Sequence, residues 1–215
     1  MKLFIDTADV GQIREAHAWG IVDGVTTNPS HVAKTGRPAD SLYREICAIA
    51  DFPVSLEAVS LTVPDLVAEG RCLAAISRNV VVKIPVTREG LSAVQILSRE
   101  GIRTNVTVTF SPLQALLAAK SGATYISPFV GRLDSIGHEG MDLVHHIKTI
   151  YDNYGFTTEI LVAAVRHPNH VLRAALAGAG ICTMNFEVMS QLYDHPISKL
   201  VMEQFLKDWE KVPKS

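Results

Sequence analysis

The chain has 215 residues, 47% of them hydrophobic, and its 20 Lys and Arg against 22 Asp and Glu give a formal net charge of −2. This composition excludes an intrinsically disordered protein, and the lack of a basic surplus argues against nucleic acid as a partner. No apolar run reaches the roughly 18 residues of a membrane span, and the N-terminus lacks the apolar stretch of a signal peptide, so we expect a cytoplasmic protein with no membrane partner.

Eight short runs rich in β-branched residues divide the chain, and each precedes a longer segment with helical spacing. Such runs are typical of strands buried on both faces of a parallel sheet. The predicted strands are residues 3–7, 24–28, 54–60, 80–86, 103–109, 125–130, 159–165 and 181–186. Helices are predicted at about 9–19, 111–121 and 168–177. Gly20, Gly101, Gly122 and Gly178 stand at helix ends, where a left-handed C-cap favours glycine.

The alternation of strands and helices predicts an α/β fold, and eight units match a (β/α)8 TIM barrel. At about 27 residues per unit the chain is compact for a barrel, near the low end of its typical size. The alternative is a doubly wound open sheet, which usually carries a glycine-rich loop after its first strand. Here that turn reads Asp6-Thr7-Ala8-Asp9, without glycine, which favours the barrel. We expect residues 1–215 to form one domain.

A further helical segment, at about 198–211, follows the eighth unit. Leu200, Phe205 and Trp209 belong to an apolar face at helical spacing. A closed barrel does not need this helix, so we expect the apolar face to pack either on the outside of its own barrel or on another subunit.

Lys83 lies in the middle of an apolar strand, Val80-Val81-Val82-Lys83-Ile84-Pro85-Val86. Burying a charged amine is costly, and burial favours the neutral amine, which is a nucleophile toward carbonyl carbons. This is the requirement for Schiff-base catalysis. The alternative is an edge-strand lysine whose ammonium group reaches water.

Polar side chains also interrupt the other predicted strands. Residues two apart in a strand point to the same side, so polar groups from six strands can converge inside one barrel, as catalytic groups do in this fold. These residues are Asp6, Thr26, Asn28, Glu57, Lys83, Asn105, Thr107, Thr109 and Ser127, with Phe129 on the same side as Ser127. The alternative is a set of hydrogen-bonded core hydroxyl groups with two surface carboxylates.

Two arginines, Arg132 and Arg166, follow the sixth and seventh predicted strands. A guanidinium group suits phosphate oxygens, and barrels often bind phosphate near strands seven and eight. The alternative for each arginine is a surface ion pair.

Metal binding is not indicated. His167 and His170, like His145 and His146, have no carboxylate or cysteine at zinc-ligand spacing, so we interpret them as helix-start and surface residues. Three widely separated cysteines predict reduced, mostly buried thiols. No P-loop or HExxH motif occurs.

The motifs around these residues resemble those of the small-subunit transaldolases, in the transaldolase and fructose-6-phosphate aldolase family of class I aldolases. The resemblance extends from Phe4-Ile5-Asp6-Thr7 to Phe205-Leu206-Lys207-Asp208-Trp209. It is carried by Gly24-Val25-Thr26-Thr27-Asn28-Pro29-Ser30, Val82-Lys83-Ile84-Pro85-Val86-Thr87, Ser127-Pro128-Phe129-Val130-Gly131-Arg132 and Val165-Arg166-His167-Pro168.

The resemblance implies a transferase of the non-oxidative pentose phosphate pathway. A dihydroxyacetone unit would pass from fructose 6-phosphate or sedoheptulose 7-phosphate to an aldose phosphate, either erythrose 4-phosphate or glyceraldehyde 3-phosphate. Lys83 would form the Schiff base, Asp6 would be the acid–base group at C–C cleavage, and Glu57 with Thr107 would hold a proton-relaying water. Substrate hydroxyl groups would be bound by Asn28, Asn105 and Ser127, supported by Thr26, and the phosphate by Arg132 and Arg166. No cofactor or metal is implied, and members form homopentamers or homodecamers through the last helix.

Two positions depart from the family pattern. Ala164 stands where a serine usually contacts the phosphate, and Asn185 stands where a proline usually precedes Phe186. Both departures bear on phosphate binding more than on Schiff-base chemistry.

Three functions remain open at this stage: a transaldolase, an aldolase that releases free dihydroxyacetone, and a non-catalytic barrel used only for assembly. Aldolase members resemble each other in having glutamine at the position of Glu57 and tyrosine at that of Phe129, so both residues favour transfer. The complete set of Lys83, Asp6, Glu57 and Thr107 argues against a non-catalytic barrel.

Overall fold

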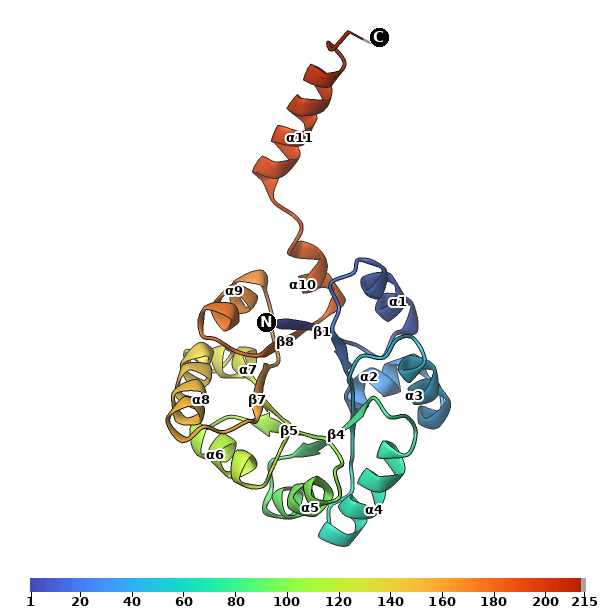
Figure 1. Cartoon of the computed structure of the whole chain (residues 1–215), viewed down its shortest axis with the longest axis vertical. Coiled ribbons are helices and arrows are strands. Elements are labelled where there is room, and N and C mark those ends of the chain that lie inside the picture. Colours follow the sequence, from blue (N-terminus) through green and yellow to red (C-terminus); the bar gives the residue numbers. More distant parts are fainter. Residues whose placement is uncertain (214–215) are drawn as a thin grey trace.

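A computed structural model describes residues 1–213, leaving the last two residues of the expected 1–215 domain outside the described part. Within that part, eight parallel strands pair in chain order and close through β1 and β8 into one barrel, surrounded by helices (Figure 1). The strands are β1 (Lys2–Asp6), β2 (Gly24–Thr26), β3 (Val54–Glu57), β4 (Val80–Pro85), β5 (Thr104–Thr109), β6 (Tyr125–Pro128), β7 (Glu159–Val162) and β8 (Ile181–Met184). The (β/α)8 prediction is confirmed, and the open doubly wound sheet is excluded.

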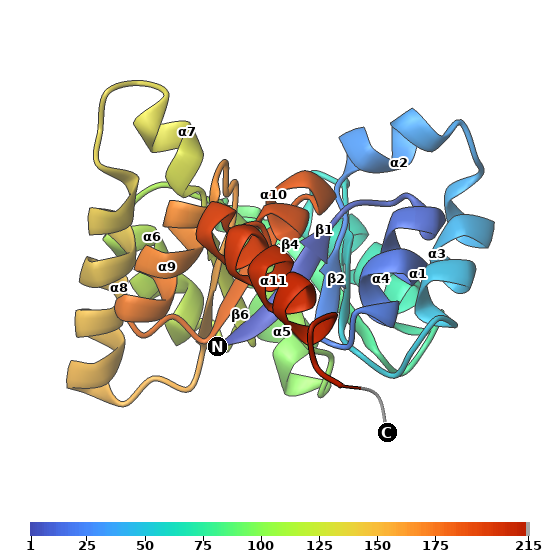
Figure 2. The ribbon, with the colours of Figure 1, turned by 90° about the horizontal axis from the view of Figure 1, so that it is seen from above.

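The helices follow the strands in the order that the alternation predicts, with short additional helices after β2, β6 and β8. They are α1 (Val10–Ala18), α2 (Pro29–Thr35), α3 (Ala39–Cys47), α4 (Val63–Ala74), α5 (Arg88–Arg99), α6 (Pro112–Lys120), α7 (Val130–Asp134), α8 (Gly140–Tyr154), α9 (Pro168–Leu176), α10 (Phe186–Gln191) and α11 (Pro196–Trp209). The four glycines expected at helix ends all have φ between 75° and 83°, as a left-handed cap requires. Figure 2 shows α2 and α7 standing at the same end of the barrel, on opposite sides.

Two hydrophobic clusters hold the barrel together. The larger lies between the strands and the surrounding helices. The smaller fills the barrel interior and consists of Phe4, Val81, Tyr125, Leu161, Ala163 and Ile181. Gly24 makes room for it, because a Cβ at that position would lie 2.4 Å from the Phe4 ring. The polar end of the interior therefore rests on a packed apolar layer.

A bulge in β5 changes one predicted orientation. Val106 pairs with Ile126, but the next pair along the ladder is Thr109 with Pro128, so β5 has one extra residue. The bulge contains Val108, whose φ of 60° accommodates the extra residue. Because partners in a parallel ladder point to the same side, Thr109 follows Pro128 outward and does not share the inward face of Thr107. The prediction that Thr109 lies on that face is wrong.

The C-terminal helix α11 begins two residues earlier than predicted, because Pro196 suits the first turn of a helix. None of its residues is buried, and it projects away from the barrel (Figure 1). The alternative that its apolar face packs on its own barrel is therefore wrong for this structure, and packing on another subunit stays a prediction. No helix among the described residues has the length and apolar character of a membrane span.

Candidate active site

Lys83 is buried inside the barrel, with only 5% of its surface exposed. Its amine lies 2.9 Å from Oε2 of Glu57 and donates a hydrogen bond of 3.0 Å to the carbonyl oxygen of Thr27. Glu57 faces it because the two residues are register partners in β3 and β4. A closed barrel has no edge strand, so the alternative of an edge lysine reaching water is excluded.

A second carboxylate, Asp6, lies at the end of β1. Thr26 donates a 2.7 Å hydrogen bond to Oδ1 of Asp6, and its hydroxyl group also lies 2.7 Å from that of Thr183 on β8. Nδ1 of His31 is 3.7 Å from the same Asp6 oxygen. Asp6 is thus held on one side and remains partly exposed, as a group that exchanges protons with a ligand must be.

A chain of buried polar groups crosses from β3 to β6. Nδ2 of Asn105 donates to Ser55, and Ser127 donates a 2.7 Å hydrogen bond to Oδ1 of Asn105. The amide of Asn105 is therefore fixed in orientation. Thr107, further along β5, has a buried hydroxyl group with no hydrogen-bond partner among residues 1–213. An unsatisfied buried hydroxyl group is costly, which makes this one suited to a water or a ligand.

Asn28, which is predicted to bind a substrate hydroxyl group, also stabilises the start of a helix. It is the N-cap of α2, and its side-chain oxygen accepts the backbone N–H of His31 at 2.9 Å. Its Nδ2 lies 3.2 Å from Nδ1 of His31. The side chain therefore stays at the rim of the barrel, where Nδ2 has a second N–H group left to donate to a ligand.

Phe129 points inward from the end of β6. Its backbone bridges to Ala163, and its ring packs against the interior cluster and, edge to face, against Phe110 at a centroid distance of 5.8 Å. The phenyl ring therefore adds an apolar surface on the inward face of β6 and has no group that could donate a proton.

Arg132 on α7 and Arg166 after β7 are both exposed. The arginine ion pairs of residues 1–213 are made by other arginines, so the expected alternative of a surface ion pair is wrong for both. Gly131 brings the two segments together, since a Cβ there would lie 2.6 Å from Cγ of Arg166 and 2.3 Å from the carbonyl oxygen of Ala164. Two unpaired guanidinium groups on adjoining segments suit an anion with several oxygens.

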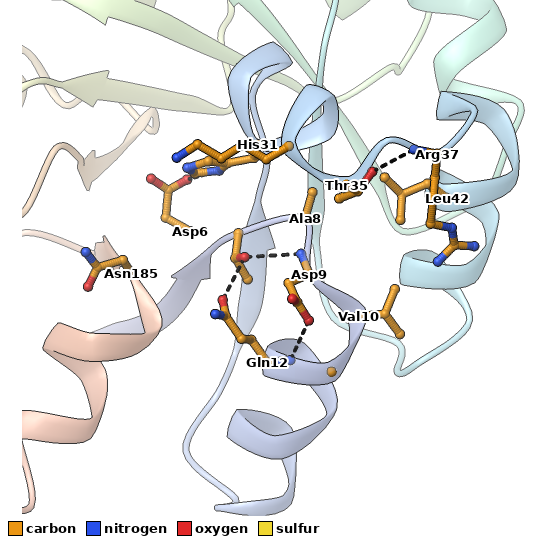
Figure 3. A pocket seen from close by; sticks show the side chains of 13 residues that line it. Asp6, Ala8, Asp9, Val10, Gln12, His31, Thr35, Arg37, Leu42 and Asn185 are labelled. Atoms are coloured by element: carbon orange, nitrogen blue, oxygen red, sulfur yellow. Dashed lines mark hydrogen bonds and ion pairs between the residues drawn. The ribbon is translucent and has the colours of Figure 1, made fainter.

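A cavity of about 680 Å³ opens beside Asp6 (Figure 3). In this view His31 lies next to Asp6, and Asn185 stands on the opposite wall. The side-chain oxygen of Asn185 caps α10 by accepting the backbone N–H of Val188 at 2.8 Å. Asn185 therefore acts both as a turn residue and as part of the wall near Asp6.

Sequence reasoning missed three residues of this site: Ser55, Thr183 and His31. The first two could have been found by strand alternation, because each lies two positions before a residue that was considered, Glu57 and Asn185. His31 follows Asn28 by three residues, the spacing at which the first turn of a helix brings side chains together.

The two buried cysteines, Cys47 and Cys182, do not compete with Lys83 as nucleophiles. Burial raises the pKa of Cys47 to about 11 and that of Cys182 to about 12, so both thiols stay protonated near neutral pH. Cys72 is exposed, but two of the three cysteines are buried, so the expectation of mostly buried thiols is confirmed. The described residues contain no group of three or more His, Cys, Asp or Glu able to hold a metal ion.

Comparison with known proteins gives one consistent result. Residues 3–214 match the model of the family described as transaldolase/fructose-6-phosphate aldolase. The chain is 62% identical to a "Probable transaldolase" of Aquifex aeolicus (strain VF5) over 213 residues, 99% of this chain and 98% of that protein. It is 58% identical over 214 residues to a protein of the same name from Geobacter metallireducens, with both chains fully covered.

Proposed function

The chain belongs to the transaldolase/fructose-6-phosphate aldolase family, a family of enzymes, and on this premise we propose that it is a transaldolase of the non-oxidative pentose phosphate pathway. It transfers a dihydroxyacetone unit from fructose 6-phosphate or sedoheptulose 7-phosphate to glyceraldehyde 3-phosphate or erythrose 4-phosphate. The observation that carries the proposal is a lysine amine buried inside the barrel, 2.9 Å from the carboxylate of Glu57.

The first step is attack of the Lys83 amine on the ketone carbon of the sugar. The amine must be neutral to attack, and Glu57 is within reach to take its proton. Loss of water from the carbinolamine needs proton transfer, for which a water between Glu57 and the unpaired hydroxyl group of Thr107 is suited. The resulting iminium ion is the electron sink, so the proposal needs no metal or organic cofactor.

Cleavage follows when Asp6 removes the proton of the C4 hydroxyl group. The C3–C4 bond breaks, its electrons move to the iminium ion, and an aldose phosphate leaves. The three-carbon unit stays on Lys83 as an enamine. An acceptor aldose phosphate then forms the new C–C bond, and Asp6 returns the proton to its carbonyl oxygen. Asn28, Asn105 and Ser127 bind hydroxyl groups, and Arg132 with Arg166 bind the phosphate.

The alternative within the family is an aldolase that releases free dihydroxyacetone. Phe129 favours transfer, because a phenyl ring neither donates a proton nor holds a hydrolytic water near the enamine carbon. A coupled assay with and without erythrose 4-phosphate separates the two activities. A transaldolase makes product only with the acceptor, whereas an aldolase releases dihydroxyacetone without it.

The experiment that tests the mechanism is trapping of the Schiff base. Incubation with fructose 6-phosphate and borohydride should place a stable adduct on Lys83, mapped by mass spectrometry. Lys83→Ala should remain folded and give no adduct. Lys120→Ala, at the exposed end of α6, is the matched control and should be labelled like the parent protein. An adduct on another lysine, or no adduct at all, contradicts the mechanism.

We also propose that residues 1–215 act as one cytoplasmic domain that assembles as a homopentamer or homodecamer through α11. The helix exposes Leu200, Phe205, Leu206 and Trp209, each to more than 60%, and such contiguous apolar surface is typical of an interface. Truncation after Pro196 should dissociate the assembly, whereas Glu203→Ala on the same helix should not. Light scattering that gives the 23.4 kDa of a single chain for the intact protein contradicts the proposal.

A further inference from the structure

His170 is a buried residue next to the candidate phosphate site. It lies in the first turn of α9 and is only 4% exposed, so the interpretation of this histidine as a helix-start residue holds but that of a surface residue does not. Its Nδ1 accepts the backbone N–H of Arg166 at 3.3 Å. Its Nε2 lies 2.8 Å from Oδ2 of Asp134, the last residue of α7.

These two contacts select one form of the ring. Since Nδ1 accepts a hydrogen bond, the single proton of the neutral imidazole lies on Nε2, facing the carboxylate. The two atoms are within hydrogen-bond distance but not ideally aligned, and Oδ2 is buried with no aligned donor among residues 1–213. Oδ1 of Asp134 accepts the backbone N–H of Gly140 at 2.8 Å, which holds the carboxylate in place.

The pair connects the two segments that carry the exposed arginines. Asp134 follows Arg132 by two residues on α7, and His170 holds the backbone of Arg166 directly. The backbone just before Arg166 is strained, because Ala164 has a φ of 57° without being glycine. A segment that leaves a strained residue needs contacts of this kind to keep one geometry.

Burial and the neighbouring groups together lower the pKa of His170, which favours its neutral form. Burial lowers its pKa, the nearby His167 lowers it further, and Asp134 opposes both. The ring of His167 stacks on it at a centroid distance of 3.9 Å. Arg173, on the same helix, also lowers the pKa of His170. Its own ion-pair partner is Glu139, the residue just before α8, at 2.9 Å. The acceptor on Nδ1 is thus retained near neutral pH.

We propose that His170 and Asp134 form a positioning unit that sets the spacing of the Arg132 and Arg166 guanidinium groups to fit the phosphate of the substrate. This inference rests on the proposed function, because it takes the two arginines as the phosphate site. Bidentate contacts depend on geometry, so loosening either segment weakens phosphate binding while leaving Lys83 in its strand.

Two variants separate the two contacts. His170→Asn keeps an acceptor near the place of Nδ1 but cannot reach Asp134, and His170→Gln keeps a donor near the place of Nε2 but loses the acceptor for Arg166. We expect each to raise the KM for fructose 6-phosphate about tenfold, or ~1.4 kcal/mol, with kcat changed less than twofold. Dihydroxyacetone has no phosphate, so the concentration of it that gives half-maximal borohydride-trapped adduct on Lys83 should not change.

Thr158→Val is the matched control. It removes a buried hydrogen bond of 2.7 Å to the carbonyl oxygen of Ala123, before β7 and at the other end of the strand from Arg166. It should lower the unfolding temperature without changing the KM. A His170 effect that is equal for fructose 6-phosphate and dihydroxyacetone means a structural role only and overturns the inference, as does an unchanged KM in both variants. Failure of the proposed function is distinct, because the parent protein would then give no adduct on Lys83.

Discussion

Replacing Lys83 by methionine tests the buried pair on which the site is built. The change keeps the length and apolar stem of the side chain but removes the charge, leaving the carboxylate of Glu57 without its partner at 2.9 Å. Lys83 and Glu57 side chains are only 7% and 13% exposed, so water does not replace the lost partner. We therefore expect Lys83→Met to destabilise the protein as well as to abolish Schiff-base formation.

The size of the effect follows from the geometry. Two unit charges 2.9 Å apart attract by about 6 kcal/mol at an effective dielectric constant of about 20. Part of this repays the cost of burying both groups, and removal of one partner of such a pair typically costs about 3–5 kcal/mol. The partial exposure of Glu57 favours the lower end. For a chain of 215 residues, about 3 kcal/mol lowers the unfolding midpoint by roughly 6–12 °C.

The assay is thermal unfolding at pH 7 and equal protein concentration for the parent, Lys83→Met, Glu57→Gln and the double variant. The double variant should recover at least half of the loss, because it buries no unpaired charge. Arg44→Met is the control, since its pair with Asp40 is exposed and should contribute nothing measurable. A parent-like midpoint for Lys83→Met, or strictly additive effects in the double variant, would refute the reasoning.

Three further outcomes are expected. Phe129→Tyr adds a hydroxyl group beside the enamine and should raise the ratio of free dihydroxyacetone to sedoheptulose 7-phosphate at fixed erythrose 4-phosphate, each tenfold change being about 1.4 kcal/mol; an unchanged ratio would mean that the ring only packs. Gly131→Ala places a Cβ 2.6 Å from Cγ of Arg166 and should raise the KM for fructose 6-phosphate about tenfold, or ~1.4 kcal/mol, while dihydroxyacetone trapping persists; a parent-like KM would argue against the arginine pair. Folding lowers the pKa of His170, so in acid the unfolded chain binds more protons at this residue than the folded protein does. The contribution of His170 to the free energy of unfolding is therefore fully present above pH 6.5 and is lost as the pH falls through the folded pKa. Melting curves at several pH values should show that acid lowers the unfolding midpoint less in His170→Asn than in the parent protein.

Much of this protein could be predicted from local features of the sequence. Strand periodicity, the glycines at helix ends and the apolar run around Lys83 depend only on neighbouring residues, and the structure confirms all of them. The convergence of polar side chains also followed, because alternation along each strand determines which residues face inward once the barrel closes. Candidate site residues that are defined by their type and their spacing along the chain can thus be predicted before the fold is known.

Contacts between distant segments were decided only by the tertiary structure. The register of β3 on β4 places Glu57 against Lys83, and the bulge at Val108 turns Thr109 outward; both depend on how strands pair, which no local pattern encodes. The same holds for the contact of His170 with Asp134, whose segments meet only because β6 and β7 are neighbours in the barrel. The apolar face of α11 was visible in the sequence, but that its own barrel leaves it uncovered is a property of the fold, because burial depends on what packs against a helix.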